Sequence, residues 1–156
     1  MVRKYPEPII DGMDDIKQKA QERGRKIQLP YAGALLPAEA HVLMQQGAKL
    51  VDVRTDAELH YVGSVPGSEA IEWNSIDGQR NPAFLRQLEQ VAGKEDTVMF
   101  LCRSGARSHA AAAAAAQAGW KEAYNVLEGF EGDKDSQDHR NTVGGWRYAR
   151  LPWVQS

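Results

Sequence analysis

The segment that most constrains the fold is DTVMFLC at residues 96–102, a nearly unbroken apolar run. A short apolar run without polar alternation is typical of a central parallel strand that is covered on both faces. A short loop, RSGAR, follows, and then comes a segment with alanine at every position from 110 to 116. Because alanine favours helices and has a minimal side chain, we expect a helix here that packs tightly against the sheet.

On both sides of this segment, short apolar stretches alternate with helical patterns. Further strands are predicted within residues 48–54, 68–73 and 122–129, and further helices within residues 37–47, 55–63 and 81–93. Thr55 and Asn81 are candidate N-caps, and Gly63 is a candidate stop signal. Strands that alternate with helices predict an α/β layered fold with a mainly parallel sheet.

The first 30 residues differ from the rest of the chain. Residues 1–30 are polar and contain DDIKQKAQERGRK, which predicts a helix with acidic residues in its first turn and basic residues in its last. We interpret this segment as a solvated N-terminal helical extension, with a partner-docking arm as the alternative, and take residues 31–156 as the domain. Residues 131–145 are charged and punctuated by glycine, which predicts a surface loop.

Composition narrows the classes of partner. The chain has 156 residues and a formal net charge of −2, which suits one domain and gives no broad electrostatic attraction to nucleic acid or to an anionic membrane. The sequence shows no segment with the apolar length of a signal peptide or a membrane span. We therefore expect a cytoplasmic protein in which the single cysteine, Cys102, stays reduced.

Cys102 stands where ligands bind in open parallel sheets, beyond the carboxyl end of a strand. Gly105 can adopt a positive φ, which lets consecutive loop N–H groups turn towards one anion. The N-terminus of the next helix adds partial positive charge, and Arg103 and Arg107 add full charges. These features favour a thiolate and an anionic substrate over the simpler alternative, an inert buried cysteine.

The histidines do not require a different chemistry. His109, one turn into the helix, is a possible base for Cys102, but a thiolate held by backbone dipoles and arginines needs none, so we interpret this side chain as packed or exposed. His60 is expected near the mouth of the site, His41 on another helix and His139 in the long loop. No pair has metal-ligand spacing, so we predict no metal.

Several separated motifs resemble the rhodanese (thiosulfate sulfurtransferase) family in its single-domain form. CRSGAR, at residues 102–107, resembles the six-residue active-site loop of that family. LVDVRTDAELHYVGSVPGSEAIEW resembles its Asp-Val-Arg strand, acidic helix and Pro-Gly turn, and NVLEGFEG and GGWRYARLPW resemble its C-terminal segments. The resemblance implies a three-layer fold in which helices flank a mainly parallel, five-stranded sheet.

The resemblance also implies a reaction. Cys102 would take a sulfane sulfur from thiosulfate or a related persulfide donor and hold it as a persulfide, until a thiophilic acceptor, cyanide or a thiol, removes it. Loop N–H groups would stabilise the sulfur anion, from the residues Arg103, Ser104, Gly105, Ala106, Arg107 and Ser108. Arg103 and Arg107 would orient the small anionic donor. No cofactor is implied, and the donor or the acceptor could be another protein.

The other loop side chains have weaker assignments. Ser104 and Ser108 are possible hydroxyl donors, although for Ser108 we prefer the role of helix cap. Asp52, Arg54 and Glu58 match the family's Asp-Val-Arg motif and its acidic partner. We expect an ion pair between Arg54 and Glu58 that braces the loop, with a direct substrate role for Arg54 as the alternative.

Three functions are compatible with these residues, and we prefer a sulfurtransferase. A phosphatase or a thiol-dependent arsenate reductase on the same fold is the second. Phosphatase relatives have a loop one residue longer, whereas four residues separate Cys102 from Arg107 here. The smaller loop suits a sulfane sulfur better than a tetrahedral oxyanion. The third is a non-catalytic sulfur-relay or interaction module, against which the intact cysteine loop argues.

Overall fold

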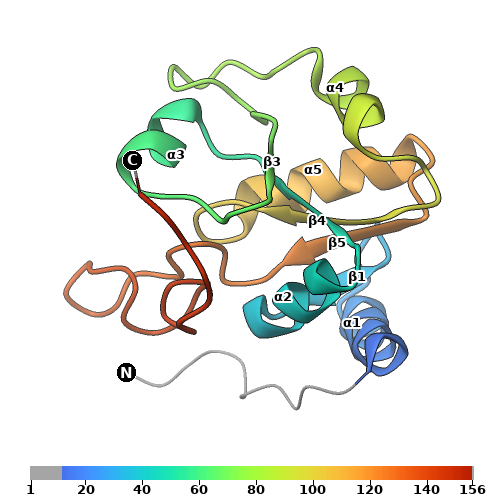
Figure 1. The fold of residues 1–156 in the computed structure, drawn as a ribbon, viewed down its shortest axis with the longest axis horizontal. Coiled ribbons are helices and arrows are strands. Elements are labelled where there is room, and N and C mark those ends of the chain that lie inside the picture. Colours follow the sequence, from blue (N-terminus) through green and yellow to red (C-terminus); the bar gives the residue numbers. More distant parts are fainter. Residues whose placement is uncertain (1–11, 156) are drawn as a thin grey trace.

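The computed structural model describes residues 12–155, which form a five-stranded sheet with helices on both faces (Figure 1). The strands are β1 (Gly33–Leu35), β2 (Lys49–Asp52), β3 (Glu69–Ala70), β4 (Thr97–Leu101) and β5 (Glu122–Val126). The helices are α1 (Met13–Lys26), α2 (Pro37–Gln45), α3 (Asp56–Tyr61), α4 (Phe84–Val91) and α5 (Ala106–Gln117). The strand order is β1-β5-β4-β2-β3 and every pairing in the sheet is parallel, which confirms the predicted fold class.

β4 lies at the centre of the sheet and carries the core on both faces. Val98 and Phe100 pack in one buried cluster with side chains of α4 and α5. Met99 and Leu101 pack in a second cluster with side chains of α1 and α2. The alternation continues to Cys102, which joins the first cluster. The prediction made from the apolar run, a central parallel strand that is covered on both faces, is therefore confirmed.

The alanine-rich helix packs closely against the sheet, as expected. Ala111, Ala112 and Ala115 of α5 are fully buried against the face that holds Phe100. Small side chains let the helix axis approach the strands closely. This packing places the first turn of α5 next to Cys102.

The interpretation of α1 as a solvated helix is wrong. Ile16 and Ala20 of α1 are fully buried in the core, and a Cβ atom at Gly33 would lie 2.4 Å from the Ala20 carbonyl oxygen. Arg23 at the end of α1 binds both carboxylate oxygens of the buried Glu39 in α2, at 2.6 and 2.8 Å. α1 therefore completes one layer of the fold. The boundary at residue 30 stays a prediction, and residues 1–11 of that extension lie outside the described residues.

Two other local expectations need correction. β1, which pairs with β5 at the edge of the sheet, comes from a stretch in which the pattern predicted no strand. α4 begins at Phe84 rather than directly after Asn81, whose side chain instead accepts a hydrogen bond from Ala83 N in a preceding turn. Both differences lie at the periphery of the sheet, away from the cysteine loop.

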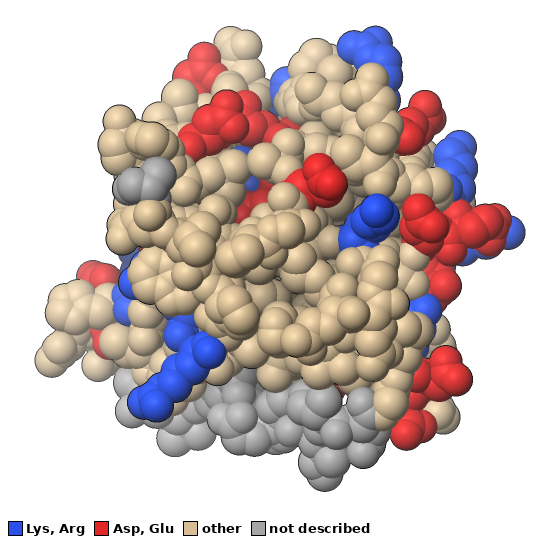
Figure 2. Space-filling view, in the orientation of Figure 1, with Lys and Arg blue, Asp and Glu red and all other residues tan. Residues whose placement is uncertain are grey.

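The surface matches the near-neutral net charge. Figure 2 shows basic and acidic side chains on the same face, around a middle that is largely free of charge. None of the helices in residues 12–155 is long and apolar enough to cross a membrane.

Candidate active site

The cysteine loop lies at the carboxyl end of β4, where the expected turn is present. Gly105 is the N-cap of α5 and has a φ of 119°, a conformation that glycine adopts without strain. In this turn the backbone N–H of Gly105 donates to Cys102 Sγ, at 3.1 Å. The sulfur thus receives a backbone donor at the positive end of α5, and its residue is 1% exposed.

Ser108 does not cap the helix. It lies within α5, whose N-cap is Gly105, and it is fully buried. Its Oγ lies 3.3 Å from Cys102 Sγ and donates to Asn125 Oδ1 at 2.6 Å. The hydroxyl therefore lies beside the sulfur, and its alternative role as a hydroxyl donor there stays a prediction.

The expected ion pair between Arg54 and Glu58 does not form. The side chain of Arg54 turns back to Asp52, with Nε 3.0 Å from Oδ1 and Nη2 2.8 Å from Oδ2. Arg54 Nη2 also donates to the Gly63 carbonyl oxygen at 2.7 Å, and the guanidinium lies 4.2 Å from the centre of the Phe130 ring. Asp52 and Arg54 are both fully buried, so this pair is fixed within the fold.

Glu58 instead binds Arg107 of the cysteine loop. Both carboxylate oxygens accept from the guanidinium, at 2.6 and 2.9 Å, across 49 positions of sequence. Thr55 caps α3, as predicted, and its backbone N–H and hydroxyl both donate to Glu58. Arg107 was expected to orient the donor, but the structure ties it to α3 by two hydrogen bonds.

This second pair changes the pKa of both partners. Burial opposes ionisation of Glu58, but the hydrogen bond from Arg107 and that from the Thr55 backbone outweigh it and lower the pKa of Glu58 from 4.5 to about 2. The hydrogen bond to Glu58 outweighs burial of Arg107 in the same way and raises the pKa of Arg107 above its ordinary value. Both groups therefore stay charged through the neutral pH range.

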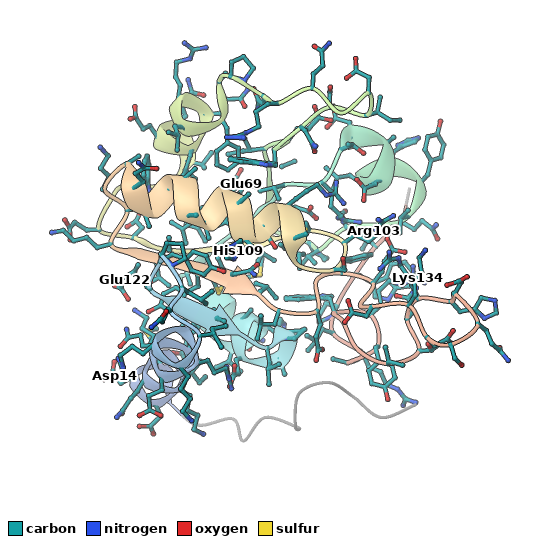
Figure 3. All side chains as sticks on the ribbon, turned by 180° about the vertical axis from the view of Figure 1, so that it is seen from behind. Asp14, Glu69, Arg103, His109, Glu122 and Lys134 are labelled. Carbon is teal, nitrogen blue, oxygen red and sulfur yellow. The ribbon has the colours of Figure 1, made fainter. Side chains whose placement is uncertain are left out.

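Arg103 is the more accessible cation of the loop. Its side chain is exposed, and its carbonyl oxygen accepts from Glu131 N and Gly132 N. Figure 3 shows Arg103 beside the loop that carries Lys134, just outside the N-terminal end of α5. The exposed guanidinium of Arg103 is therefore available to an anionic substrate.

Two cavities flank the cysteine loop. The larger has a volume of about 530 Å³, and its lining includes Glu58, Tyr61, Ile76, Arg103 and Arg107. The smaller, of about 360 Å³, lies on the other side of the loop, and its lining includes Tyr31, Ser104, Gly105, His109 and Glu128. The exposed Arg103 lines the first cavity, so this cavity is the better candidate for binding an anionic donor.

Three of the histidines each contact an aromatic side chain. His109 is exposed at the smaller cavity, and its Nδ1 lies 2.6 Å from the Tyr31 hydroxyl. His60 stacks edge-on against Tyr61 of α3, and His41 against Trp146. Within residues 12–155, no three His, Cys, Asp or Glu side chains gather closely enough to hold a metal ion.

Asn125 is the site residue that the sequence pattern missed. It lies in β5, is 4% exposed, and contacts both Ser108 and the Gly105 carbonyl oxygen. A signal was present, because a lone amide side chain near the carboxyl end of an apolar parallel strand points towards the ligand edge of the sheet.

A model of the rhodanese-like domain family matches residues 36–136. Uncharacterized protein RP600 of Rickettsia prowazekii (strain Madrid E) is 35% identical over 117 residues, which cover 72% of this chain and 87% of that protein. The chain therefore belongs to the rhodanese-like domain family.

Two further similarities are to a named sulfurtransferase and to a solved crystal structure. Thiosulfate sulfurtransferase 18 of Arabidopsis thaliana is 31% identical over 98 residues, which cover 60% of this chain and 71% of that protein. The crystal structure of Rv0390 from M. tuberculosis superposes with a TM-score of 0.74 at 42% sequence identity, and covers 81% of this chain and 99% of that one. The fold is therefore shared over most of the described chain.

Proposed function

We propose that the protein is a sulfurtransferase that moves a sulfane sulfur from thiosulfate, or from a related persulfide, to cyanide or to a thiol. One observation carries the proposal. Cys102 Sγ receives the Gly105 N–H at the N-terminus of α5, where a sulfur anion is stabilised without a metal or a cofactor. A sequence relative that is named a thiosulfate sulfurtransferase supports the same chemistry.

The proposed reaction has two displacements. The Cys102 thiolate attacks the outer sulfur of thiosulfate, the sulfur–sulfur bond of thiosulfate breaks, and sulfite leaves with the bonding electron pair. Cyanide then attacks the outer sulfur of the Cys102 persulfide and leaves as thiocyanate, which returns the thiolate. A thiolate acceptor would leave as a persulfide in the same way.

The loop arginines favour sulfur transfer over phosphate or arsenate chemistry. Phosphoryl transfer requires cationic groups that are aimed at the oxyanion. Both carboxylate oxygens of Glu58 accept hydrogen bonds from the Arg107 guanidinium, so the positive charge of Arg107 is already balanced. The Cys102 persulfide that remains after sulfite has left carries one negative charge, so it requires less charge compensation than a transferring phosphoryl group. The need for a reduced thiol also leads us to propose a cytoplasmic location.

The test is the intact mass of the protein before and after incubation with thiosulfate, followed by cyanide. We expect the wild type to gain one sulfur atom and to lose it to cyanide with release of thiocyanate. The Cys102→Ser variant serves as the control and should gain none. An unmodified wild-type protein whose thiol still reacts with iodoacetamide would exclude thiosulfate as the donor. p-Nitrophenyl phosphate and arsenate are then assayed as substrates of the alternative reactions.

A further inference from the structure

The larger cavity beside the cysteine loop has walls of two kinds. One wall is the cysteine loop, which contributes Arg103 and Arg107. The others come from α3 and from the turn at residues 74–78, and they contribute the large apolar side chains Tyr61 and Ile76. Figure 1 shows this turn, in the chain between β3 and α4, close to α3. The cavity therefore combines a cationic part with an apolar part.

The two apolar side chains of this cavity are left open to water. Tyr61 and Ile76 are 74% and 78% exposed, the highest values among the exposed large hydrophobic residues of the described chain. Neither belongs to the two core clusters of residues 12–155, so folding does not use their apolar surface. Single exposed apolar side chains are common, but two that line one cavity form a surface that a ligand can cover.

The turn that carries Ile76 is tied to the core. Within the turn, Gly78 N donates to the Ser75 carbonyl oxygen at 2.9 Å. Directly after it, the Arg80 guanidinium lies 3.6 Å from the centre of the Trp73 ring, which is buried in the core. The exposed position of Ile76 is therefore set by an ordered turn.

Arg103, rather than Arg107, is the cation that this cavity offers to a ligand. Both carboxylate oxygens of Glu58 bind the Arg107 guanidinium, whereas the Arg103 side chain is exposed. A matching ligand carries a negative charge for Arg103 and an apolar group for Tyr61 and Ile76. Thiosulfate has the charge but no apolar group, and the cavity volume of about 530 Å³ lies in the range of about 300–1,000 Å³ that is typical of sites for larger molecules.

We propose that this cavity binds an organic sulfane-sulfur anion, in which Tyr61 and Ile76 bind the apolar group and Arg103 binds the charge. The simplest example is a thiosulfonate. The Cys102 thiolate attacks its terminal sulfur, the sulfur–sulfur bond breaks, and an organic sulfinate leaves with the bonding electron pair. This inference rests on the proposed sulfur transfer and makes Tyr61 and Ile76 the residues that determine its donor specificity.

The test compares benzenethiosulfonate with methanethiosulfonate, two donors that have the same reacting group and differ in the size of the apolar group. Thiocyanate formation with cyanide gives kcat/KM for each donor, after subtraction of the rate with Cys102→Ser. In the double variant Tyr61→Ser, Ile76→Ser, we expect the ratio of the benzene value to the methane value to fall roughly tenfold, because the ring loses the apolar surface that covers it. The intrinsic reactivities of the donors cancel when ratios of two proteins are compared.

Two controls separate the apolar contact from other effects. Tyr148 is 41% exposed and is not among the described residues that line the cavity, so Tyr148→Ser should keep the wild-type ratio. Arg103→Gln should lower kcat/KM for both donors by similar factors and also keep the ratio, because the two donors carry the same charge. The melting temperature reports whether each variant is folded.

The outcomes distinguish this inference from the function on which it rests. A wild-type ratio in the folded double variant would overturn the inference and leave sulfur transfer in place, because both donors would still yield thiocyanate. A wild-type dimer that becomes a monomer in the double variant, measured by sedimentation, would overturn it by showing that a second copy covers Tyr61 and Ile76. If thiosulfate and both thiosulfonates left Cys102 without added sulfur, the proposed function would fail together with the inference. If the double variant does not fold, each single variant gives the same test with a smaller expected fall.

Discussion

Two arginine–carboxylate pairs lie near the cysteine loop and differ mainly in burial. The pair of Asp52 and Arg54 has no exposed side-chain surface, whereas the side chains of Arg107 and Glu58 are 23% and 21% exposed. The first pair joins residues two apart at the end of one strand. The second joins α3 to the cysteine loop at the wall of the larger cavity.

Because of this difference in burial, we expect the first pair to stabilise the fold and the second pair to respond to pH and to substrate. Inside the fold, a charge without its partner is costly, so Asp52 and Arg54 are fixed for as long as the protein is folded. At the cavity wall, water and substrate can compensate a charge, so Glu58 and Arg107 can exchange partners at a lower cost. The comparison predicts effects on folding for the first pair and effects on pH response and substrate binding for the second.

The largest effect is expected from Arg54→Met, which leaves the buried Asp52 carboxylate without a cation. We expect a loss of about 3–5 kcal/mol in the free energy of unfolding, because an unpaired buried charge is not solvated. Denaturant unfolding measures it. The double variant Asp52→Asn, Arg54→Met should recover part of the loss, because no charge is then left unpaired. Equal losses in the single and the double variant would contradict this account of the pair.

The pairing of Glu58 with Arg107, and not with Arg54, could not be predicted from the sequence. The strand before Cys102, the positive φ of Gly105 and the Thr55 cap are set by neighbouring residues, so local pattern predicts them. Glu58 meets Arg107 across 49 positions, and that choice depends on how α3 and α5 lie around the sheet. The spacing of four between Arg54 and Glu58 suggests a helical pair, but Arg54 lies in the turn between β2 and α3 and not in α3.

Small residues explain the misjudged N-terminal helix in a similar way. α1 approaches β1 through Ala20 and Gly33, contacts that leave no large apolar stripe in the sequence. Its polar composition therefore predicts a solvated helix, although Ile16, Ala20 and Gly24 are buried in the core. The three residues of β1 are also too few to show a periodic pattern.

An effect of intermediate size on the free energy of unfolding is expected when the pH is lowered. Because the pKa of Glu58 is lowered from 4.5 to about 2 in the folded protein, its ionisation contributes stability that is fully present above pH 4.5. This contribution is lost as the pH falls from 4.5 towards 2, and it amounts to up to about 3 kcal/mol. The lowered pKa values of Asp77 and Asp135 add their own pH dependence. The measurement is therefore the difference in unfolding free energy between wild type and Glu58→Gln, and a difference that stays constant below pH 4.5 would contradict the pairing.

The smallest effect concerns substrate, and it rests on the proposed sulfur transfer. Glu58→Gln keeps the shape of the side chain but releases the charge of Arg107 at the cavity wall. If an anionic donor binds there, the freed guanidinium should attract it, and we expect the KM for thiosulfate to fall about threefold. The value of kcat should change less, because the two hydrogen bonds of the Arg107 guanidinium go to Glu58 and not to the sulfur. Steady-state thiocyanate formation gives both constants.

Glu72→Gln is the matched control for this change. Glu72 accepts a hydrogen bond from Asp56 N at the start of α3, so its substitution removes a negative charge near the same helix without freeing Arg107. A fall in KM for Glu58→Gln alone would show that the cation itself was released, whereas equal falls in both variants would reflect only the change in net charge. A rise in KM for Glu58→Gln would mean that Glu58 holds Arg107 in the position that the donor requires. The partly exposed pair would then be as fixed in its function as the buried pair is in the fold.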